Sequence, residues 1–189
     1  MARVNNNIFI RGLSGNLGNQ FIIKTDKGGR TIVSAKPYFP ANREFSPAQL
    51  AHQQAFREAV AYANKAKGEE IYKIKANGGP KSAYNVALGD YFNPPQILEI
   101  DLSGWVNGDG GTIRVRAQDD VKVQQVKVTI ADESGTLLEE GEASEAGALW
   151  WEYSTAQAAV DNLRVTVAAK DLPGHVTKRS ELKGQPRMP

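Results

Sequence analysis

Four aspartates in the second half of the sequence have the chemistry to bind a hard metal ion. Asp109, Asp119, Asp120 and Asp171 lie in or beside turn-forming stretches, and carboxylate oxygens are ligands that Ca²⁺ prefers. The segment 107–111 lacks the alternating ligand series and the terminal glutamate of a calcium loop. Aspartate side chains also accept hydrogen bonds from the backbone of their own turns. We therefore favour turn capping for all four, and we expect no metal and no cofactor.

Residue types for nucleophilic or acid–base catalysis are sparse. The chain has no cysteine, and its two histidines, His52 and His175, are far apart in the sequence. Glu139 and Glu140 are consecutive, so on a strand they point to opposite faces and do not form an acid–base pair. Residues 180–183 match the S-x-x-K spacing of a serine nucleophile, but its companion motifs are missing. We expect no enzymatic activity.

Two glycine-containing stretches invite comparison with phosphate-binding loops. Gly12, Gly15 and Gly18 have G-x-x-G-x-x-G spacing, and strand-forming residues follow where a dinucleotide-binding motif requires a helix. In residues 79–82, Pro80 removes a backbone amide that a phosphate would need. Both patterns indicate turns.

Charge is divided unevenly between the two halves of the chain. The net charge of +2 comprises +7 over residues 1–93 and −5 over residues 94–189. Opposite charges favour attraction between copies or docking of the basic half on an acidic partner, and a chance difference between two solvated surfaces is an equally good interpretation. No groove-reading motif accompanies the basic residues, so nucleic-acid binding is the second hypothesis. The basic surface in question comprises Arg3, Arg11, Lys24, Lys27 and Arg30.

The elements that would position these residues begin with short strands. Runs rich in β-branched and aromatic residues at 7–11, 20–24 and 31–35 are separated by glycine-containing turns. Three short strands cannot bury a core of their own, so this sheet needs a helix or another subunit as a cover. An exposed strand arm is also a template for strand addition. The residues expected to mediate assembly are Ile8, Phe9, Ile10, Phe21, Ile22 and Ile23.

Helices follow the strands. Residues 46–49 form a capping box, Ser-Pro-Ala-Gln, with proline at the first helical position, which predicts a helix over 47–65. Residues 69–76 are compatible with a second helix or a strand. Ser82 is expected to cap a third segment, 83–92, which is apolar nearly all round.

The consecutive prolines Pro94 and Pro95 end the helical part, because each fixes φ and holds the preceding residue extended. We place a domain boundary there. A basic α+β domain with an N-terminal strand arm then covers residues 1–93, a second domain covers 94–183, and 184–189 form a tail.

The second domain has the pattern of an all-β immunoglobulin-like sandwich. Seven short strand candidates are separated by strong turn signals at intervals of 8 to 12 residues. Trp150 or Trp151 is expected to fill the core, because neighbouring strand residues face opposite sides. The strand candidates are 96–102, 112–117, 121–131, 136–143, 149–154, 162–169 and 176–182.

Two resemblances accompany these patterns. The first half resembles a family of uncharacterised bacterial and phage-associated proteins through its glycine-rich start, Lys36-Pro37 and the Ser46 helix cap, and this implies no activity. The second half resembles bacterial immunoglobulin-like modules of surface and virion proteins through Asp119-Asp120, the turn at 132–135 and the turn at 168–174. The immunoglobulin-like fold hosts many functions, so the resemblance implies a fold and a setting rather than a reaction.

These patterns lead to one expectation and two alternatives. We expect a non-enzymatic structural protein that self-associates through its N-terminal strands and displays an immunoglobulin-like domain, in a filament, a phage or tail-like particle, or a surface layer. Its expected partners are further copies and other structural proteins. The alternatives are a nucleic-acid-binding module and a hydrolase or lectin-like sandwich, which would need a cleft lined by polar groups.

We expect no insertion in a membrane, because no apolar run approaches the ~20 residues of a spanning helix. The polar start lacks the apolar region of a signal peptide. We therefore expect synthesis in the cytoplasm and incorporation into an extracellular or virion assembly.

Overall fold

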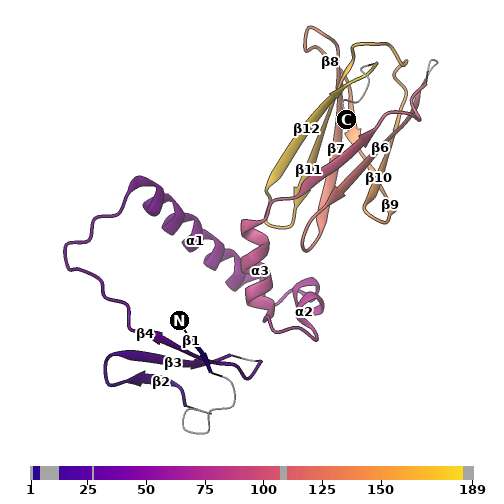
Figure 1. The fold of residues 1–189 in the computed structure, drawn as a ribbon. Helices are drawn as coiled ribbons and strands as arrows, with labels where there is room; N and C mark the ends of the chain where they lie inside the picture. The colour runs from indigo at the N-terminus through magenta and orange to yellow at the C-terminus, as the bar shows by residue number, and fades with distance from the viewer. Residues whose placement is uncertain (1, 5–12, 27, 107–109, 185–189) are drawn as a thin grey trace. The chain divides into compact units, whose positions relative to one another are not determined.

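The computed structural model describes residues 2–4, 13–26, 28–106 and 110–184 (Figure 1). In that part of the chain, three helices and twelve strands form a mixed α+β fold whose strands make three antiparallel four-stranded sheets. The chain divides into two compact units, residues 1–57 with 78–81, and residues 58–77 with 82–189. The predicted domain boundary at residues 93–94 stays a prediction.

The first unit contains a sheet with the strand order β1-β4-β3-β2. The predicted strands at 20–24 and 31–35 are confirmed as β3 and β4, whereas β1 was not predicted and β2 forms where turns were expected. The predicted strand at 7–11 lies outside the described residues. The bounds are β1 Ala2–Val4, β2 Gly15–Leu17, β3 Phe21–Thr25 and β4 Thr31–Ala35.

A tight turn at Gly18 and Asn19 joins β2 to β3. Both residues have a φ of 58°, and Gln20 N donates to Leu17 O at 3.2 Å. Two central residues with positive φ are typical of a type I′ turn, whose twist matches that of the flanking strands. Glycine followed by asparagine suits this turn, because both residues tolerate the left-handed region.

The capping signals correctly located the helices. At the start of α1 (Pro47–Ala66), Ser46 Oγ accepts from Gln49 N at 3.3 Å and Gln49 Oε1 accepts from Ser46 N at 3.0 Å. The 69–76 segment is helical, as α2 (Glu70–Ala76). Ser82 Oγ accepts from the amide of residue 85 at 3.3 Å, at the start of α3 (Ala83–Phe92).

In the second unit, small side chains allow these helices to pack closely. Ala63 and Ala66 near the end of α1 and Ala87 in α3 are fully buried, together with Tyr72 of α2. They share one hydrophobic cluster with Val121, which lies outside the helices in the segment that follows β6. Although α3 is apolar nearly all round, it is only partly buried: Ala87 and Asp90 are fully buried, and most of its other residues are half-buried.

The strands of the second unit form two sheets, with the orders β5-β6-β10-β9 and β12-β11-β7-β8. All seven predicted strands are present, and β9 was missed. The bounds are β5 Gln96–Asp101, β6 Gly111–Gln118, β7 Val123–Ala131, β8 Leu137–Glu142, β9 Ser144–Gly147, β10 Trp150–Thr155, β11 Arg164–Asp171 and β12 Val176–Leu182.

Both sheets contribute alternate residues to one hydrophobic core. Val115 of β6, Val128 of β7 and Val167 of β11 are fully buried, as period-2 alternation requires. Trp151 faces this core, in agreement with the expectation for one of the two consecutive tryptophans. The largest fully buried side chain is nevertheless Trp105, whose Nε1 donates to Gln157 O at 2.9 Å.

Candidate functional site

Strand register determines which predicted assembly residues share a face of the N-terminal sheet. Phe21 and Ile23 alternate along β3, and they pair with Leu17 of β2 and Val33 of β4, respectively. Directly paired residues lie on the same face, so these four apolar side chains form one surface, which we call the apolar face. Ile22 is on the opposite face. The structure therefore brings together two of the three described assembly residues.

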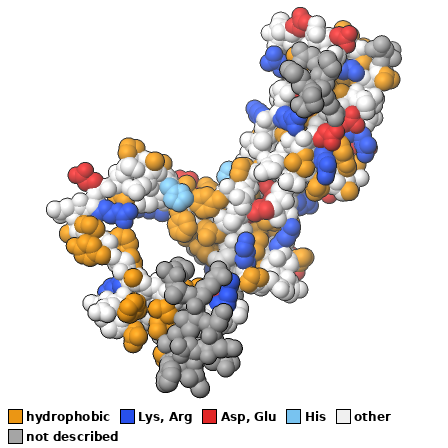
Figure 2. Space-filling model, viewed as in Figure 1, with side chains coloured by type: hydrophobic (Ala, Val, Ile, Leu, Met, Phe, Trp, Pro, Cys, Tyr) orange, Lys and Arg blue, Asp and Glu red, His pale blue; other side chains and the backbone are white. Residues whose placement is uncertain are grey.

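Two of the four side chains of the apolar face are exposed. Leu17 and Phe21 have exposed fractions of 54% and 44%, whereas Ile23 has 4%. Among the described residues from 13 to 57, the buried side chains are those of Ile23 and Thr31. Figure 2 shows apolar side chains at the surface of this unit. Ile8, Phe9 and Ile10, the other predicted assembly residues, lie outside the described residues.

The segment between β4 and α1 adds exposed aromatic residues. Tyr38, Phe39 and Phe45 are all exposed. The guanidinium carbon of Arg43 lies 5.4 Å from the ring centroid of Phe39 and 4.8 Å from that of Phe45. Arg43 is thus attracted to both rings, which remain exposed.

The predicted basic surface is only partly described. Arg30 is tied to Asp26, with Nε 2.6 Å from Oδ2 and a further bond from its backbone amide, so its charge is offset locally. That backbone hydrogen bond, followed by the guanidinium, lowers the pKa of the Asp26 carboxyl. Lys24 is exposed on the face that carries Ile22. Arg11, Lys27 and the side chain of Arg3 lie outside the described part.

Of the four aspartates considered as metal ligands, two cap turns as expected. Asp171 Oδ1 accepts from the amides of Gly174 and His175 at 2.7 and 2.6 Å, and its Oδ2 lies 2.9 Å from His175 Nδ1. Asp119 Oδ1 accepts from the amides of residues 121 and 122 at 2.9 and 3.1 Å. Asp109 lies outside the described residues.

Asp119 also belongs to a carboxylate cluster with Asp120, which the sequence analysis considered beside it, and with Asp90, which it did not. Asp119 and Asp120, in the loop between β6 and β7, meet Asp90 of α3, and one oxygen from each lies within 4.8 Å of the others. Asp90 is fully buried. Burial, together with the charges of Asp119 and Asp120, raises the pKa of Asp90 to about 7, and burial also raises the pKa of Asp119. We call these three residues the aspartate cluster.

Glu139 and Glu140 point in opposite directions, as predicted. Glu139 accepts from Tyr153 OH at 2.6 Å and from Thr155 Oγ1 at 2.9 Å, whereas Glu140 pairs with Lys127 Nζ at 2.9 Å. Burial opposes ionisation of Glu139, but these hydrogen bonds hold its pKa below the usual range. Burial and the Glu139 carboxylate raise the pKa of Tyr153 to about 12. Each of the two carboxylates is thus held by partners within the strand-rich unit.

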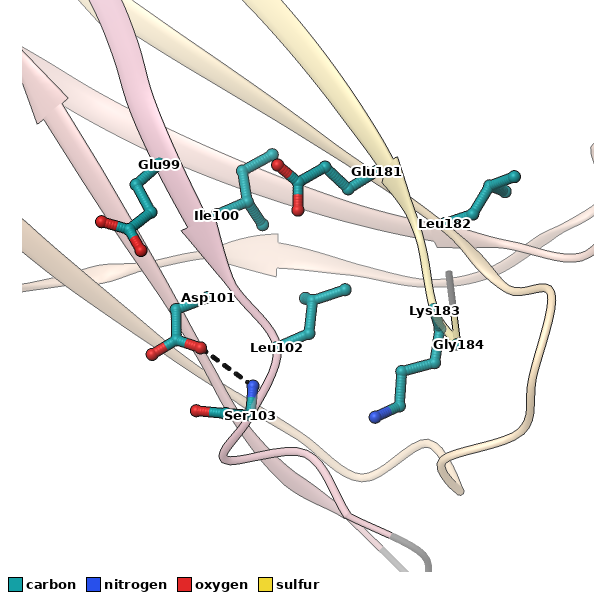
Figure 3. A pocket seen from close by; sticks show the side chains of 9 residues that line it. All are labelled: Glu99, Ile100, Asp101, Leu102, Ser103, Glu181, Leu182, Lys183 and Gly184. Carbon is teal, nitrogen blue, oxygen red and sulfur yellow. Dashed lines mark hydrogen bonds between the residues drawn. The ribbon is translucent and has the colours of Figure 1, made fainter. Parts of the chain in front are cut away.

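A polar pocket lies between the edge strands β5 and β12 (Figure 3). Its carboxylates are already engaged: Asp101 Oδ1 accepts from Ser103 N at 3.0 Å, and Glu181 pairs with Arg179 at 2.8 Å. Lys183 donates to the backbone carbonyl of Trp105. The lining comprises Glu99–Ser103 and Glu181–Gly184, a set with no histidine. The first two contacts are local, whereas the contact from Lys183 links the segment after β12 to the loop after β5.

Comparisons with known proteins are limited to partial structural likenesses. No family model matches the chain, and no curated protein matches it. A crystal structure of an engineered protein shares 24% identity and a TM-score of 0.37 over 48% of this chain, which spans 18% of that protein. The crystal structure of CopC from Methylosinus trichosporium OB3b shares 18% identity and a TM-score of 0.36 over 46% of this chain and 87% of CopC. At these TM-scores neither likeness carries a functional argument.

The helices were also compared with the length and hydropathy of membrane-spanning segments. In the described part of the chain, none of the three is both long and apolar enough to cross a bilayer.

Proposed function

We propose that this chain is a non-enzymatic assembly protein whose N-terminal sheet is covered by a second copy and whose strand-rich unit is displayed as an immunoglobulin-like domain. The observation that carries the proposal is the exposure of Leu17 and Phe21 on the apolar face: among the described side chains of β2, β3 and β4, those of Ile23 and Thr31 are buried. Full burial of such a side chain contributes about 1.5–3 kcal/mol, so covering this face stabilises an assembly.

The edge of the same sheet offers a second means of association. In the described residues, β2 is the last strand in the order β1-β4-β3-β2, so one side of its backbone pairs with no strand. Exposed edges accept another strand by backbone hydrogen bonding. Identical edges pair most simply around a two-fold axis, which makes a second copy the natural partner. The charges of +7 and −5 on the two halves also favour association of copies.

The immunoglobulin-like assignment is supported by strand order. If the eight strands β5 to β12 are lettered A, B, C, C′, D, E, F and G, the two sheets read A-B-E-D and G-F-C-C′. Immunoglobulin domains place A, B, E and D in one sheet and C, F and G in the other. Apolar packing around Trp105 and Trp151 would replace the inter-sheet disulfide of antibody domains, since the chain has no cysteine. Such a domain is a stable unit for display and implies no reaction.

The test compares the full chain with a variant in which Phe21→Glu places a charge on the apolar face. Light scattering coupled to size-exclusion chromatography should show oligomers of the wild type that grow with concentration. The variant should be smaller at every concentration. Asn16→Glu, at an exposed position on the other face of the sheet, adds the same charge and is the matched control, and we expect it to assemble like the wild type.

A wild type that stays a monodisperse monomer at all concentrations would refute the proposal. If that monomer bound generic DNA with an affinity that fell steeply with salt, the nucleic-acid alternative would take its place. Assembly that the Phe21→Glu variant retains in full would show that another surface mediates it.

A further inference from the structure

One oxygen of each carboxylate in the aspartate cluster is held by the protein itself. Tyr72 OH donates to Asp90 Oδ2 at 2.5 Å, and Asn93 Nδ2 donates to Asp120 Oδ2 at 3.0 Å. Two backbone amides donate to Asp119 Oδ1. The three side chains are therefore fixed in orientation by groups on α2, on the segment after α3 and in the β6–β7 loop.

The remaining oxygens of two of these carboxylates have no donor in the described part of the chain. Asp90 Oδ1 and Asp119 Oδ2 are buried, and no described residue forms a hydrogen bond with either oxygen. A buried ionised oxygen without a partner is costly, because water no longer solvates it and nothing in the protein replaces water. Carboxylates only accept hydrogen bonds, so neighbouring carboxylates cannot satisfy one another unless one of them is protonated. The group that completes this arrangement is a cation or a proton.

The local charge favours a cation with more than one charge. The hydrogen bonds place one ammonium beside the cluster: Lys75 Nζ donates to the backbone carbonyl of Asp120 at 3.1 Å. When ionised, the three carboxylates carry a charge of about −3, which one lysine offsets only in part. Asp120 is exposed at one side of the cluster, beside a cavity lined by Asn93, Gln118 and Thr177. Asp119 and Asp120 themselves line this cavity, which leaves room for bound water beside these two carboxylates.

We propose that Asp90, Asp119 and Asp120 form a binding site for one divalent cation, Ca²⁺, at the junction of α3 with the β6–β7 loop. The site is independent of the assembly proposed above, which concerns the other unit of the chain.

Ligand chemistry indicates the ion class, and the spacing of the ligands is compatible with Ca²⁺. The donors are oxygens alone, which suit hard cations such as Ca²⁺ and Mg²⁺ rather than the nitrogen and sulfur preferences of zinc or copper. Two oxygens at about 2.4 Å from one Ca²⁺ are at most about 4.8 Å apart, and the spacing in the cluster is within this limit. Mg²⁺ demands a tighter octahedron of ligands at about 2.0–2.1 Å. Two ligands from consecutive residues and one from a helix also suit the adaptable geometry of Ca²⁺.

The test uses the full chain after treatment with EDTA and exchange into chelator-free buffer near pH 7.5. Isothermal titration with CaCl₂ should give one site per chain, with a Kd below about 1 mM, the range of extracellular calcium modules. Terbium should substitute for calcium, and tyrosine excitation should sensitise its emission, because Tyr72 contacts Asp90 directly. A Ca²⁺ concentration of 100 times the Kd should raise the Tm by about 5–10 °C.

Variants separate this site from weak binding elsewhere. Asp90→Asn and Asp120→Asn should each weaken Ca²⁺ binding at least tenfold, and the exposed position of Asp120 makes its variant the one least prone to misfold. The matched control is Glu133→Gln, an exposed acidic residue in the β7–β8 turn of the same unit, which should bind like the wild type.

Several results would overturn the proposal. One is a folded wild type that shows no heat of binding, no sensitised terbium emission and no Tm shift at 5 mM Ca²⁺. This concentration is above the Kd of ~1 mM that marks the weakest calcium modules. Such a result would mean that the cluster holds a proton. Undiminished binding by both aspartate variants would locate the ion elsewhere. Tighter binding of Mg²⁺ than of Ca²⁺ would contradict the choice of ion.

Discussion

Asp90 lies on α3 with no exposed surface, and its surroundings favour the neutral carboxylic acid. Burial and two neighbouring carboxylates raise its pKa to about 7, against an ordinary value of 3.8. Tyr72 opposes this shift through its hydrogen bond to Asp90 Oδ2. Below this pKa a proton offsets the charge, and above it the cluster needs another cation.

This environment leads to a prediction about pH and stability in the absence of metal. Because Asp90 binds its proton more tightly in the folded than in the unfolded chain, folding takes up protons between pH 4 and pH 7, and stability falls as the pH rises through that range. Asp119, whose pKa is also raised, acts in the same direction. Asp90→Asn should remove much of the slope and stabilise the EDTA-treated protein at pH 8 by about 1–3 kcal/mol. Urea unfolding in EDTA at pH 5 and pH 8 measures both effects.

The charged and polar groups that face Asp90 are Tyr72 from α2 and Asp119 and Asp120 from the β6–β7 loop, with Lys75 on the Asp120 carbonyl. An unchanged slope in the Asp90→Asn variant would show that these neighbours, or groups elsewhere, control the pH dependence. Saturating Ca²⁺ should reverse the trend in the wild type, since a bound cation stabilises the ionised cluster.

A second prediction at the residue scale concerns Trp105. This side chain is fully buried in the core between the two sheets, and its indole nitrogen donates to Gln157 O. Trp105→Ala should reduce the free energy of unfolding by about 3–5 kcal/mol, as for other buried aromatic residues. Trp150→Ala, at a half-buried position beside Arg114, should cost much less. Urea unfolding measures both variants, and a similar decrease in the free energy of unfolding for the two would contradict this account of the core.

At the scale of elements, the sequence predicts those helices and strands whose positions depend on local signals. Capping by Ser46 and Ser82 and the period-2 alternation in β6, β7 and β11 located helices and strands close to their observed bounds. The strand β9 was missed, because all four of its residues are exposed and it therefore lacks an alternating pattern. Its partner is the Trp150 end of β10, where the register shifts.

The aspartate cluster could not be predicted for a different reason. Asp90 and the Asp119–Asp120 pair belong to elements of different types, and only the packing of Tyr72 and Ala87 against Val121 brings them together. The proximity of these aspartates depends on tertiary contacts, which the pattern of apolar residues along the sequence does not predict. Trp105 was overlooked similarly, since it lies in a loop rather than on a strand with alternating residues.

Two glycines provide a prediction about how the elements pack. A Cβ at Gly111, at the start of β6, would lie 2.7 Å from Trp105 Cα and 2.9 Å from Gly104 O, both backbone atoms that cannot move aside. Gly111→Ala should therefore destabilise the chain by about 1–3 kcal/mol through overpacking. Gly89, within α3, has open space around it, so Gly89→Ala should stabilise by about 0.5–1 kcal/mol. Thermal unfolding should show a lower Tm for Gly111→Ala and a higher Tm for Gly89→Ala. Tm shifts in the same direction for both variants would contradict the packing of these two glycines.

At the scale of the whole molecule, the two units differ in how much of their apolar surface they bury. The second unit packs both of its sheets around one core that contains Trp105 and Trp151. The N-terminal sheet instead leaves Leu17 and Phe21 largely exposed. The proposed assembly would cover these two exposed side chains with a second copy of the chain.

The most direct test of this assembly is the environment of the apolar face in solution. The chain has no cysteine, so Leu17→Cys and Asn16→Cys each provide one site for a spin label, on opposite faces of β2. We predict that the label at position 17 becomes immobile and couples to labels on other copies as concentration rises, while the label at position 16 stays mobile. Mobile labels at both positions, with no coupling between copies at any concentration, would contradict the account.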